Sequence, residues 1–468
     1  MTKVLTIIDT IQNRSWQSMT EILPGIVRDW TRAFKDQGYE VILHEVEKDS
    51  SGKILASVLK SDLILFTAFN LQQNQLYQMI RQKLSIEIPI GLYLHGLASV
   101  GLWPLSKWGW LQNSKAQDFF IVTSEADIQC LKKIEMKGKV LKIPFSIDDQ
   151  QLEKKARNED IHHFIFTGRI SEQKNLHTLL WGISLLRKED KKRVVLDIFG
   201  KEDHLGSPNM GKKSTAYLKT LLELIAELEL DSIVKFHGFL EREQLNNQFL
   251  SQPHTFISPS LHSDENFGMA ALRSLKNGQR ALLTAWGGHL EFNSFFKDQV
   301  DYLPVYKSSF GPVISPLDIK KAIEKALIKD QKIEPRSSAC SPDSVSKLIS
   351  AKIPQMLEQD QDQFQIGKLA RAIAEKYTHY FKASEDQNKM SKVFDGYADS
   401  WAHLFFESYG MKSPLPSEKG NNFITAPWVS DQDSHFKITD PHRGEWSLSK
   451  KEEELLFDLG LRWTVKDS

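Results

Sequence analysis

The chain has 468 residues, and its 60 Lys and Arg residues balance its 60 Asp and Glu residues, so the formal net charge is zero. This length predicts two or three domains, because one domain typically takes about 150 residues. With 41% hydrophobic and 26% charged residues, the composition is that of a folded globular protein and not of a disordered chain. A neutral chain lacks the basic field that nonspecific nucleic-acid binding requires, so we expect no nucleic-acid partner.

The cysteines and the apolar runs indicate the compartment. Cys130 and Cys340 have no spacing typical of a zinc site or a disulfide framework, which suits a reducing cytoplasm. The apolar run near the start is too short for a signal-peptide core. Residues 89–105 contain a histidine and several glycines and fall short of the roughly 20 apolar residues that cross a bilayer. We therefore expect a cytoplasmic protein without a transmembrane helix.

The first 147 residues alternate short β-rich runs with longer helical patterns, which is typical of βαβ units around a parallel sheet. Helices are predicted over residues 22–36 and 71–84, where apolar residues recur at helical spacing. The predicted strands are residues 4–8, 41–46, 63–66, 90–94, 119–122 and 140–144. This part is predicted to be a Rossmann-like, doubly wound domain.

A second alternating set follows a polar connector at residues 148–160, so a second Rossmann-like domain is predicted over residues 160–335. Its clearest helix is residues 217–230. Its predicted strands are residues 163–167, 194–199, 234–236, 255–257 and 280–283. The serine-rich stretch 337–347 is expected to end this domain. Residues 336–468 then form a C-terminal extension, with amphipathic helices over 366–377 and 390–404 that return toward the first domain and an ordered arm over 413–446.

The strand at 163–167 ends in Gly168 and Arg169, and Lys174-Asn175 opens the next helix. The carboxyl end of a parallel strand, a glycine turn and a helix N-terminus together form a place where anions bind. Arg169 and Lys174 would add a planar fork and a mobile point charge that suit a diphosphate. The same residues also fit a solvated loop that holds two ordinary cations.

A second motif follows the strand at 255–257. Pro259-Ser260 leads into an acidic loop that contains Glu265, and Gly268 allows the backbone to approach a ligand at the start of the next helix. Further on, the pair Gly287-Gly288 supplies amides that would hydrogen-bond a sugar or a phosphate.

Taken in order, these segments resemble the retaining family-4 glycosyltransferases of the GT-B fold. The similarity covers residues 164–292, and the segments that carry it are Gly168-Arg169, Lys174-Asn175, Phe236-His237-Gly238-Phe239, Pro259-Ser260, Glu265-Asn266-Phe267-Gly268, and Gly287-Gly288 before Glu291. Weaker similarity is found at His95-Gly96. The resemblance implies two doubly wound domains that face each other across a cleft.

The resemblance also implies roles for residues. The first domain would hold the acceptor and the second a nucleotide-sugar donor, with Arg169 and Lys174 on the diphosphate and Glu265 on the sugar hydroxyls. The remaining donor-binding positions are His237, Gly238 and Phe239 against the base, and Asn266, Phe267, Gly268, Gly287, Gly288 and Glu291 around the sugar and phosphates. In such enzymes the departing phosphate helps to take the acceptor proton on the same face, so no protein carboxylate nucleophile is required.

His95 ends an apolar strand, so by position it would point toward the transferred sugar or the acceptor. A buried histidine that is hydrogen-bonded to the backbone explains the same pattern. Trp103, Trp108 and Trp110 follow and have two interpretations as well. They form either a rim for a glycan or lipid-linked acceptor at the inner face of a membrane, or packing beneath a loop.

Two departures from the family pattern leave the function open. Position 273, where the family has a ribose-binding Glu, is Arg, and the first strand is not followed by a glycine-rich loop. The chain is therefore either a hexosyl-transferring enzyme that retains configuration and acts on a glycan or glycolipid, or an inactive GT-B module that binds a nucleotide sugar, a glycan or a protein. The DxD-like segments 360–362 and 431–433 lie in polar tail regions, so no metal is expected.

Overall fold

The computed structural model describes residues 2–11, 18–148, 160–202, 217–308, 311–328 and 340–358, except for several positions within 97–107 and residues 263–264. It also describes parts of 365–371 and 429–447 and residues 407–410. The chain divides into two compact units. Unit 1 comprises Met1–Asp149 and Ser337–His379, and unit 2 comprises Gln150–Arg336 and Tyr380–Ser468.

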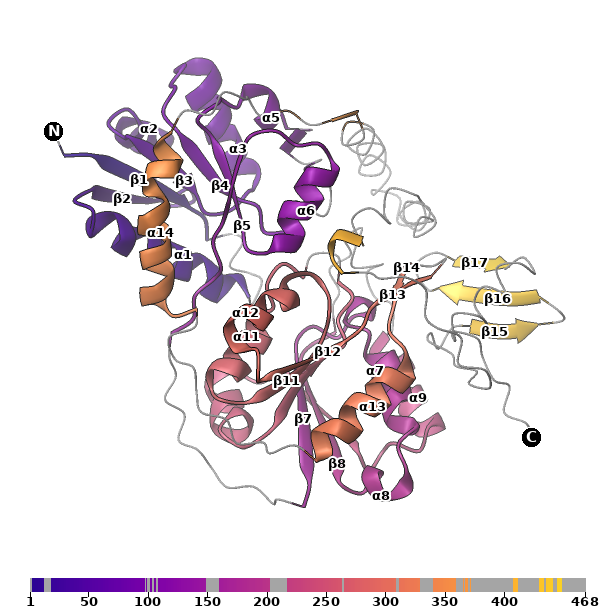
Figure 1. Ribbon diagram of the computed structural model, residues 1–468. Coiled ribbons are helices and arrows are strands. Elements are labelled where there is room, and N and C mark those ends of the chain that lie inside the picture. The colour runs from indigo at the N-terminus through magenta and orange to yellow at the C-terminus, as the bar shows by residue number, and fades with distance from the viewer. Residues whose placement is uncertain are drawn as a thin grey trace. The chain divides into compact units, whose positions relative to one another are not determined.

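Unit 1 is built on a six-stranded parallel sheet with the strand order β2-β1-β3-β4-β5-β6 (Figure 1). The strands are β1 (Val4–Asp9), β2 (Glu40–Glu45), β3 (Leu63–Phe66), β4 (Ile90–Tyr93), β5 (Phe119–Val122) and β6 (Lys139–Lys142). Every residue of β1, β3, β4 and β5 is buried, because helices cover both faces of the sheet. The predicted strands are thus confirmed, with ends that differ by at most two residues.

The helices of unit 1 follow from their apolar spacing. In α1 (Met19–Lys35) the side chains of Ile22, Ile26, Trp30 and Phe34 recur every four residues and are buried. The pattern predicted as one helix over 71–84 divides into α3 (Leu71–Gln78) and a π-helical turn (Met79–Lys83). The shorter helices are α2 (Ser51–Val58), α5 (Trp110–Asn113) and α6 (Glu125–Lys133).

Unit 2 also contains a six-stranded parallel sheet, with the strand order β12-β11-β10-β7-β8-β9. The strands are β7 (His162–Thr167), β8 (Val194–Phe199), β9 (Val234–Gly238), β10 (Thr255–Ser258), β11 (Arg280–Thr284) and β12 (Val300–Leu303). The sequence did not predict β12, because this short edge strand carries a polar Asp301 and lacks a continuous apolar run. The fold class is therefore α/β with two doubly wound units, as the GT-B fold requires.

The helices of unit 2 lie between its strands. They are α7 (Leu176–Ser184), α8 (Lys188–Lys191), α9 (Tyr217–Glu227), α10 (Arg242–Leu245), α11 (Met269–Lys276), α12 (Phe292–Phe296) and α13 (Pro316–Leu327). A hairpin joins β13 (Tyr306–Ser308) to β14 (Gly311–Val313). In the predicted arm, β15 (Val429–Gln432), β16 (His435–Asp440) and β17 (Gly444–Ser447) form an antiparallel sheet.

The chain comes back to unit 1 as α14 (Pro342–Leu357), which packs against α1 (Figure 1). The serine-rich stretch 337–347 contains the start of this helix, because Ser341 caps it by accepting a hydrogen bond from the amide of Ser344 (3.1 Å). The amphipathic helices predicted at 366–377 and 390–404 lie outside the described residues, apart from isolated positions.

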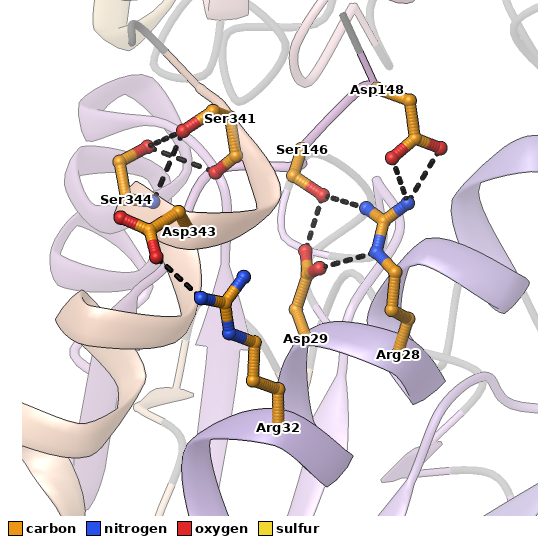
Figure 2. Close-up of polar contacts among 8 residues, drawn as sticks. All are labelled: Arg28, Asp29, Arg32, Ser146, Asp148, Ser341, Asp343 and Ser344. Carbon is orange, nitrogen blue, oxygen red and sulfur yellow. Dashed lines mark hydrogen bonds and ion pairs between the residues drawn. The ribbon is translucent and has the colours of Figure 1, made fainter. Parts of the chain in front are cut away.

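A polar cluster on α1 holds both the segment that leaves the last strand and the start of α14 (Figure 2). Arg28 donates to Ser146 Oγ (2.5 Å) and to the carboxylate of Asp148 (2.7 Å), and it pairs with the buried Asp29 (2.9 Å). One turn further along α1, Arg32 pairs with Asp343 (2.5 Å). Helix α1 thus fixes two points where the chain passes between units.

Candidate active site

The candidate donor site lies at the point where the strand order of unit 2 reverses. Strands β7 and β10 are neighbours, and the chain runs from β7 to β8 and β9 on one side and from β10 to β11 and β12 on the other. In open parallel sheets, ligands bind outside the carboxyl ends of the strands at such a switch point. Arg169 and Lys174 follow β7, and Ser260 and Glu265 follow β10. The fold therefore brings the predicted cations and the predicted carboxylate together.

Lys174, Ser260 and Glu265 form one hydrogen-bonded cluster. Lys174 Nζ lies 2.5 Å from Glu265 Oε2 and 3.3 Å from Ser260 Oγ, and the serine hydroxyl donates to the same carboxylate oxygen (2.7 Å). The side chains of Lys174 and Glu265 are only 14% and 11% exposed, so water screens the pair weakly. An ammonium group has three N–H donors, so this geometry leaves one for a ligand.

Glu265 is ionised in this cluster. Burial is the largest single influence and would raise the pKa of this carboxyl, but the Lys174 ammonium and its hydrogen bond, together with the neighbouring His289 and His262, more than offset burial and lower the pKa of Glu265 well below its ordinary value. Glu265 Oε2 is occupied by Lys174 and Ser260. Oε1 lies on the side of His289, whose Nε2 is 3.9 Å away.

His289 presents a lone pair toward Glu265. Thr284 Oγ1 donates its proton to the carbonyl of Ser260 (2.7 Å), so at the contact with His289 Nδ1 (3.2 Å) it is the histidine that donates. Burial lowers the pKa of His289, so the ring is neutral and Nε2 is an acceptor. Two acceptor atoms, Nε2 and Glu265 Oε1, thus lie on one side of the site.

Arg169 contacts His262, a residue that the sequence analysis did not single out. Arg169 Nη2 lies 3.0 Å from His262 Nε2. The imidazole is buried, and its main-chain carbonyl accepts a hydrogen bond from Trp286 Nε1 (2.8 Å). Burial, together with the charges of Lys174 and Arg169, lowers the pKa of His262 well below its ordinary value.

The described geometry is accompanied by a sequence match. Residues 148–333 match the family model of glycosyl transferases group 1. The matched segment contains both strands, β7 and β10, that carry the candidate site, and it covers less than half of the chain.

Individual proteins are similar over part or most of the chain. Over 145 residues the chain is 27% identical to mannosylfructose-phosphate synthase of Agrobacterium fabrum, and this match covers 31% of the chain and 30% of that protein. Sucrose-phosphate synthase from Thermosynechococcus elongatus has a similar structure at 15% identity and a TM-score of 0.47, covering 81% of this chain and 98% of that one. HepE from Anabaena, determined with UDP and glucose, is similar at 13% identity and a TM-score of 0.44, covering 81% of this chain and 100% of that one.

The two glycines at 287 and 288 form hydrogen bonds within the chain through their amides. The amide of Gly287 donates to the carbonyl of Tyr409 (2.7 Å), and the amide of Gly288 donates to the carbonyl of Glu265 (2.5 Å). A Cβ at position 288 would lie 2.2 Å from the backbone of Asn266. These glycines therefore hold the backbone of the Glu265 loop, and both amides already have partners within the chain.

Tyr409 is a second residue that the sequence analysis missed. Its ring is buried, packs against Trp286 (5.4 Å between ring centroids) and lies beside the backbone of Gly287. It follows the motif region by more than a hundred residues, so only the folded chain reveals that it supports the loop.

The remaining predicted donor residues comprise a glycine with special backbone geometry, a buried core residue and half-buried positions. Gly268 adopts a positive φ of 93° at the start of α11, which only glycine accepts readily. Phe267 is fully buried against Phe292 (5.5 Å) and serves the core. Asn266 and Glu291 are half-buried. Arg273 is also half-buried and lies on α11.

At the carboxyl end of β9, His237 contacts residues of the neighbouring strand β8. His237 Nε2 lies 2.7 Å from the buried carboxylate of Asp197, and its ring stacks on Phe199 (4.5 Å). Gly238 is exposed, and Phe239 is half-buried under Lys201 Nζ (4.5 Å from the ring centroid). These residues form an aromatic edge at the predicted base position.

Unit 1 has a polar cluster at its own switch point, between β1 and β3. Thr67 Oγ1 donates to the buried carboxylate of Asp9 (2.6 Å), and Asn70 Nδ2 donates to Thr10 Oγ1 (2.8 Å). The Thr10 hydroxyl in turn donates to Glu47, which follows β2 and also accepts from the amide of residue 11 (2.9 Å). The cluster was not predicted, because its members come from three separate strands.

His95 follows β4 at the same edge. Its Nε2 donates to the carbonyl of Thr67 (2.6 Å), so in the neutral ring Nδ1 carries the lone pair. The half-buried ring stacks on Tyr93 and Phe145 (5.7 Å each), and burial lowers the pKa of His95 to about 4. Nε2 of His95 is therefore bonded to the backbone, as one of the two interpretations predicts, while Nδ1 is an acceptor.

Of the three tryptophans, the two that the structure describes, Trp108 and Trp110, differ in burial. Trp110 is buried and stacks on Tyr77 (3.6 Å), so of the two interpretations packing describes this residue. Trp108 is half-buried beside Phe69 (5.0 Å). Trp103 lies outside the described residues. Within the described part of the chain, no helix is long and apolar enough to cross a membrane, and no group of three potential metal ligands gathers.

Proposed function

We propose that this protein transfers a hexose from a nucleotide-sugar donor to a hydroxyl group of a glycan or glycolipid, with retention of configuration. The observation that carries the proposal is the convergence of Arg169, Lys174 and Glu265 at the switch point of unit 2. Two cations beside one sugar-binding carboxylate match the charge pattern of a nucleoside diphosphate sugar.

The cations take the diphosphate. Arg169 offers a planar fork and Lys174 offers its remaining N–H, so side chains supply the positive charge that stabilises the departing nucleoside diphosphate. On this basis we propose that transfer has no obligatory metal ion.

Two hydrogen-bond acceptor atoms of the site bind the sugar of the donor. Glu265 Oε1 and His289 Nε2 lie 3.9 Å apart and both accept hydrogen bonds, which suits neighbouring hydroxyl donors of a pyranose. Glu265 Oε2 is already bonded to Lys174 and Ser260, and the low pKa of Glu265 makes this carboxylate a weak nucleophile. We therefore assign Glu265 to sugar binding and not to attack on the anomeric carbon.

Retention then follows from the leaving group. As the bond from C1 to the phosphate oxygen breaks, the acceptor oxygen forms its bond to C1 on the same face. The proton of the acceptor hydroxyl moves to the departing phosphate oxygen, so atoms and charge balance without a covalent enzyme intermediate. The protein's task is to hold the acceptor hydroxyl on the same face of the sugar as the departing phosphate and to neutralise charge.

The polar edge of unit 1 takes the acceptor. Glu47, Thr10 and Asn70 offer an acceptor, a hydroxyl and an amide at its switch point, and His95 Nδ1 adds a second acceptor. Such a set suits a molecule with several hydroxyl groups, and the partial match to a mannosylfructose-phosphate synthase also favours a carbohydrate. The half-buried Trp108 and Phe69 offer a ring face beside it.

The second candidate function is an inactive module that binds but does not turn over, and Arg273 is the residue that favours it. Arginine only donates hydrogen bonds, so it cannot accept from ribose hydroxyls as the family's Glu does. Isothermal titration of the native protein with UDP, GDP and ADP tests a requirement of the transferase, which is binding of a nucleoside diphosphate. The proposal expects saturable binding of at least one, and binding of none would reject the proposed transferase.

A further inference from the structure

We propose that His262 is a positioning residue that fixes the guanidinium plane of Arg169 by accepting a hydrogen bond at Nε2. The inference rests on the proposed function in one respect, namely that Arg169 binds the donor diphosphate. His262 itself is assigned no contact with the ligand.

The hydrogen bond fixes the tautomer of His262. A guanidinium group has only donors and does not lose its proton in proteins, so at the 3.0 Å contact Arg169 Nη2 donates and His262 Nε2 carries the lone pair. The imidazole must then be neutral with its proton on Nδ1. A protonated ring would present an N–H to the guanidinium and repel it.

The surroundings of His262 keep it in this state. The residue is 6% exposed, and the charges nearest to it include Lys174, Arg169 and Glu265. Burial lowers the pKa of His262 first, and the two cations lower it further, so the ring stays neutral throughout the ordinary pH range.

Two hydrogen bonds to the backbone of His262 and one to that of Leu261 fix this loop, so His262 can serve as a fixed anchor. Its carbonyl accepts from Trp286 Nε1 (2.8 Å), and its amide donates to Ser260 Oγ (3.3 Å). The preceding amide of Leu261 donates to the carbonyl of Gln173 (2.8 Å), which joins the loop after β10 to the loop after β7. His262, in the loop after β10, thus holds Arg169, in the loop after β7, across the switch point.

The hydrogen bond to His262 preorganises the guanidinium group of Arg169 for binding. An arginine side chain has several rotatable bonds, and a ligand that immobilises them loses affinity. One hydrogen bond from Nη2 to a fixed acceptor sets the plane of the guanidinium group, and with it the directions of its other N–H groups, before the diphosphate arrives. The aligned donors then meet the diphosphate without that loss.

Two substitutions of His262 separate positioning from packing. His262→Phe keeps an aromatic ring but removes the acceptor, whereas His262→Gln places an amide oxygen near the position of Nε2. We expect His262→Phe to weaken binding of the best-bound nucleoside diphosphate among UDP, GDP and ADP about 5- to 20-fold, as loss of one hydrogen bond to a charged group predicts. His262→Gln should stay within about threefold of the native affinity, since it restores that bond.

A double-mutant cycle with Arg169→Ala identifies the route of the effect. If His262 acts through Arg169, His262→Phe has no further effect on affinity in the Arg169→Ala background. The matched control is His254→Phe, which removes another buried histidine of unit 2, one bonded to Ser274 Oγ (3.3 Å). This control should lower the melting temperature and leave nucleotide affinity unchanged.

Three results would overturn the inference. They are native affinity in His262→Phe, an equal loss from His262→Phe with and without Arg169, and failure of His262→Gln to restore affinity while it folds.

A nucleotide-free measurement keeps the inference testable when the proposed function fails. In ¹⁵N-histidine NMR, the native His262 should show an unprotonated Nε2 from pH 6 to 8, and this signal should move in Arg169→Ala. A proton on Nε2, or a signal that does not respond to Arg169→Ala, rejects the positioning role whether or not the protein binds nucleotide.

Discussion

Replacing Lys174 by Met tests the buried charge cluster most sharply. The substitution keeps the length of the side chain but leaves the Glu265 carboxylate, 11% exposed, without its cation. Breaking a buried ion pair from one side costs about 3–5 kcal/mol, and the remaining hydrogen bond from Ser260 and the slight exposure reduce this to about 2–4 kcal/mol. For a unit of this size each kcal/mol lowers the melting temperature by about 2–4 °C, so calorimetry should show a loss of about 4–16 °C.

The stability deficit of Lys174→Met should depend on pH. In the native protein the pKa of Glu265 is lowered, so the pair stabilises the fold above pH 4.5, the carboxyl's ordinary pKa, and the stabilisation is lost as the pH falls toward the lowered value. In Lys174→Met, burial remains without the cation and raises the pKa of Glu265. The folded protein then takes up a proton more readily than the unfolded chain, so the deficit in melting temperature should shrink as the pH falls from 7 to 5.

Two controls complete the experiment. Adding Glu265→Gln to Lys174→Met removes the stranded charge and should recover more than half of the lost stability. Lys320→Met breaks the more exposed pair with Glu324 on α13 (3.8 Å) and should cost less than about 1 kcal/mol. A deficit in Lys174→Met that equals the Lys320→Met deficit, or that does not change with pH, would refute the assignment of a desolvated ion pair.

Other expected results test separate parts of the structure. Gly288→Ala places a Cβ 2.2 Å from the backbone of Asn266, so it should displace the Glu265 loop and lower transfer at least tenfold, whereas Gly52→Ala, at an open position, should not. Arg28→Ala leaves the buried Asp29, whose pKa burial already raises, without its cation, and should lower the free energy of unfolding by about 1–2 kcal/mol at pH 7 and by less at pH 5. Arg32→Ala removes an exposed pair and should lower it by less than about 0.5 kcal/mol. Equal losses for the two variants in urea unfolding would contradict this difference. EDTA should leave transfer activity unchanged, and activity restored by added Mg²⁺ would contradict the metal-free proposal.

The strands and the donor motifs could be predicted because they are local patterns. A fully buried parallel strand such as β3 appears in the sequence as a continuous apolar run, and Arg169 and Lys174 are separated by only a short loop. Once two alternating sets were recognised, the rule for parallel sheets placed Arg169 and Glu265 at one edge.

The missed residues depend on contacts between distant parts of the chain. His262 becomes significant only when the loop after β10 lies beside Arg169, and Tyr409 only when the tail returns to Gly287. Glu47 and Thr10 follow different strands. The choice between rim and packing for Trp110 stayed open, because the clustering of tryptophans does not reveal which ring contacts Tyr77 in the core.

Donor-dependent release of free nucleoside diphosphate tests the central proposal most directly. Native protein, Arg169→Ala and Arg273→Glu are incubated with UDP-glucose, GDP-mannose or ADP-glucose and a set of sugar acceptors, and the released diphosphate is quantified. Sugar transfer predicts release by the native protein with at least one donor, a loss of about 10- to 100-fold in Arg169→Ala, and no gain in Arg273→Glu. No release by the native protein with any donor, together with donor binding that appears only in Arg273→Glu, would contradict the transferase and identify Arg273 as the group that blocks the site.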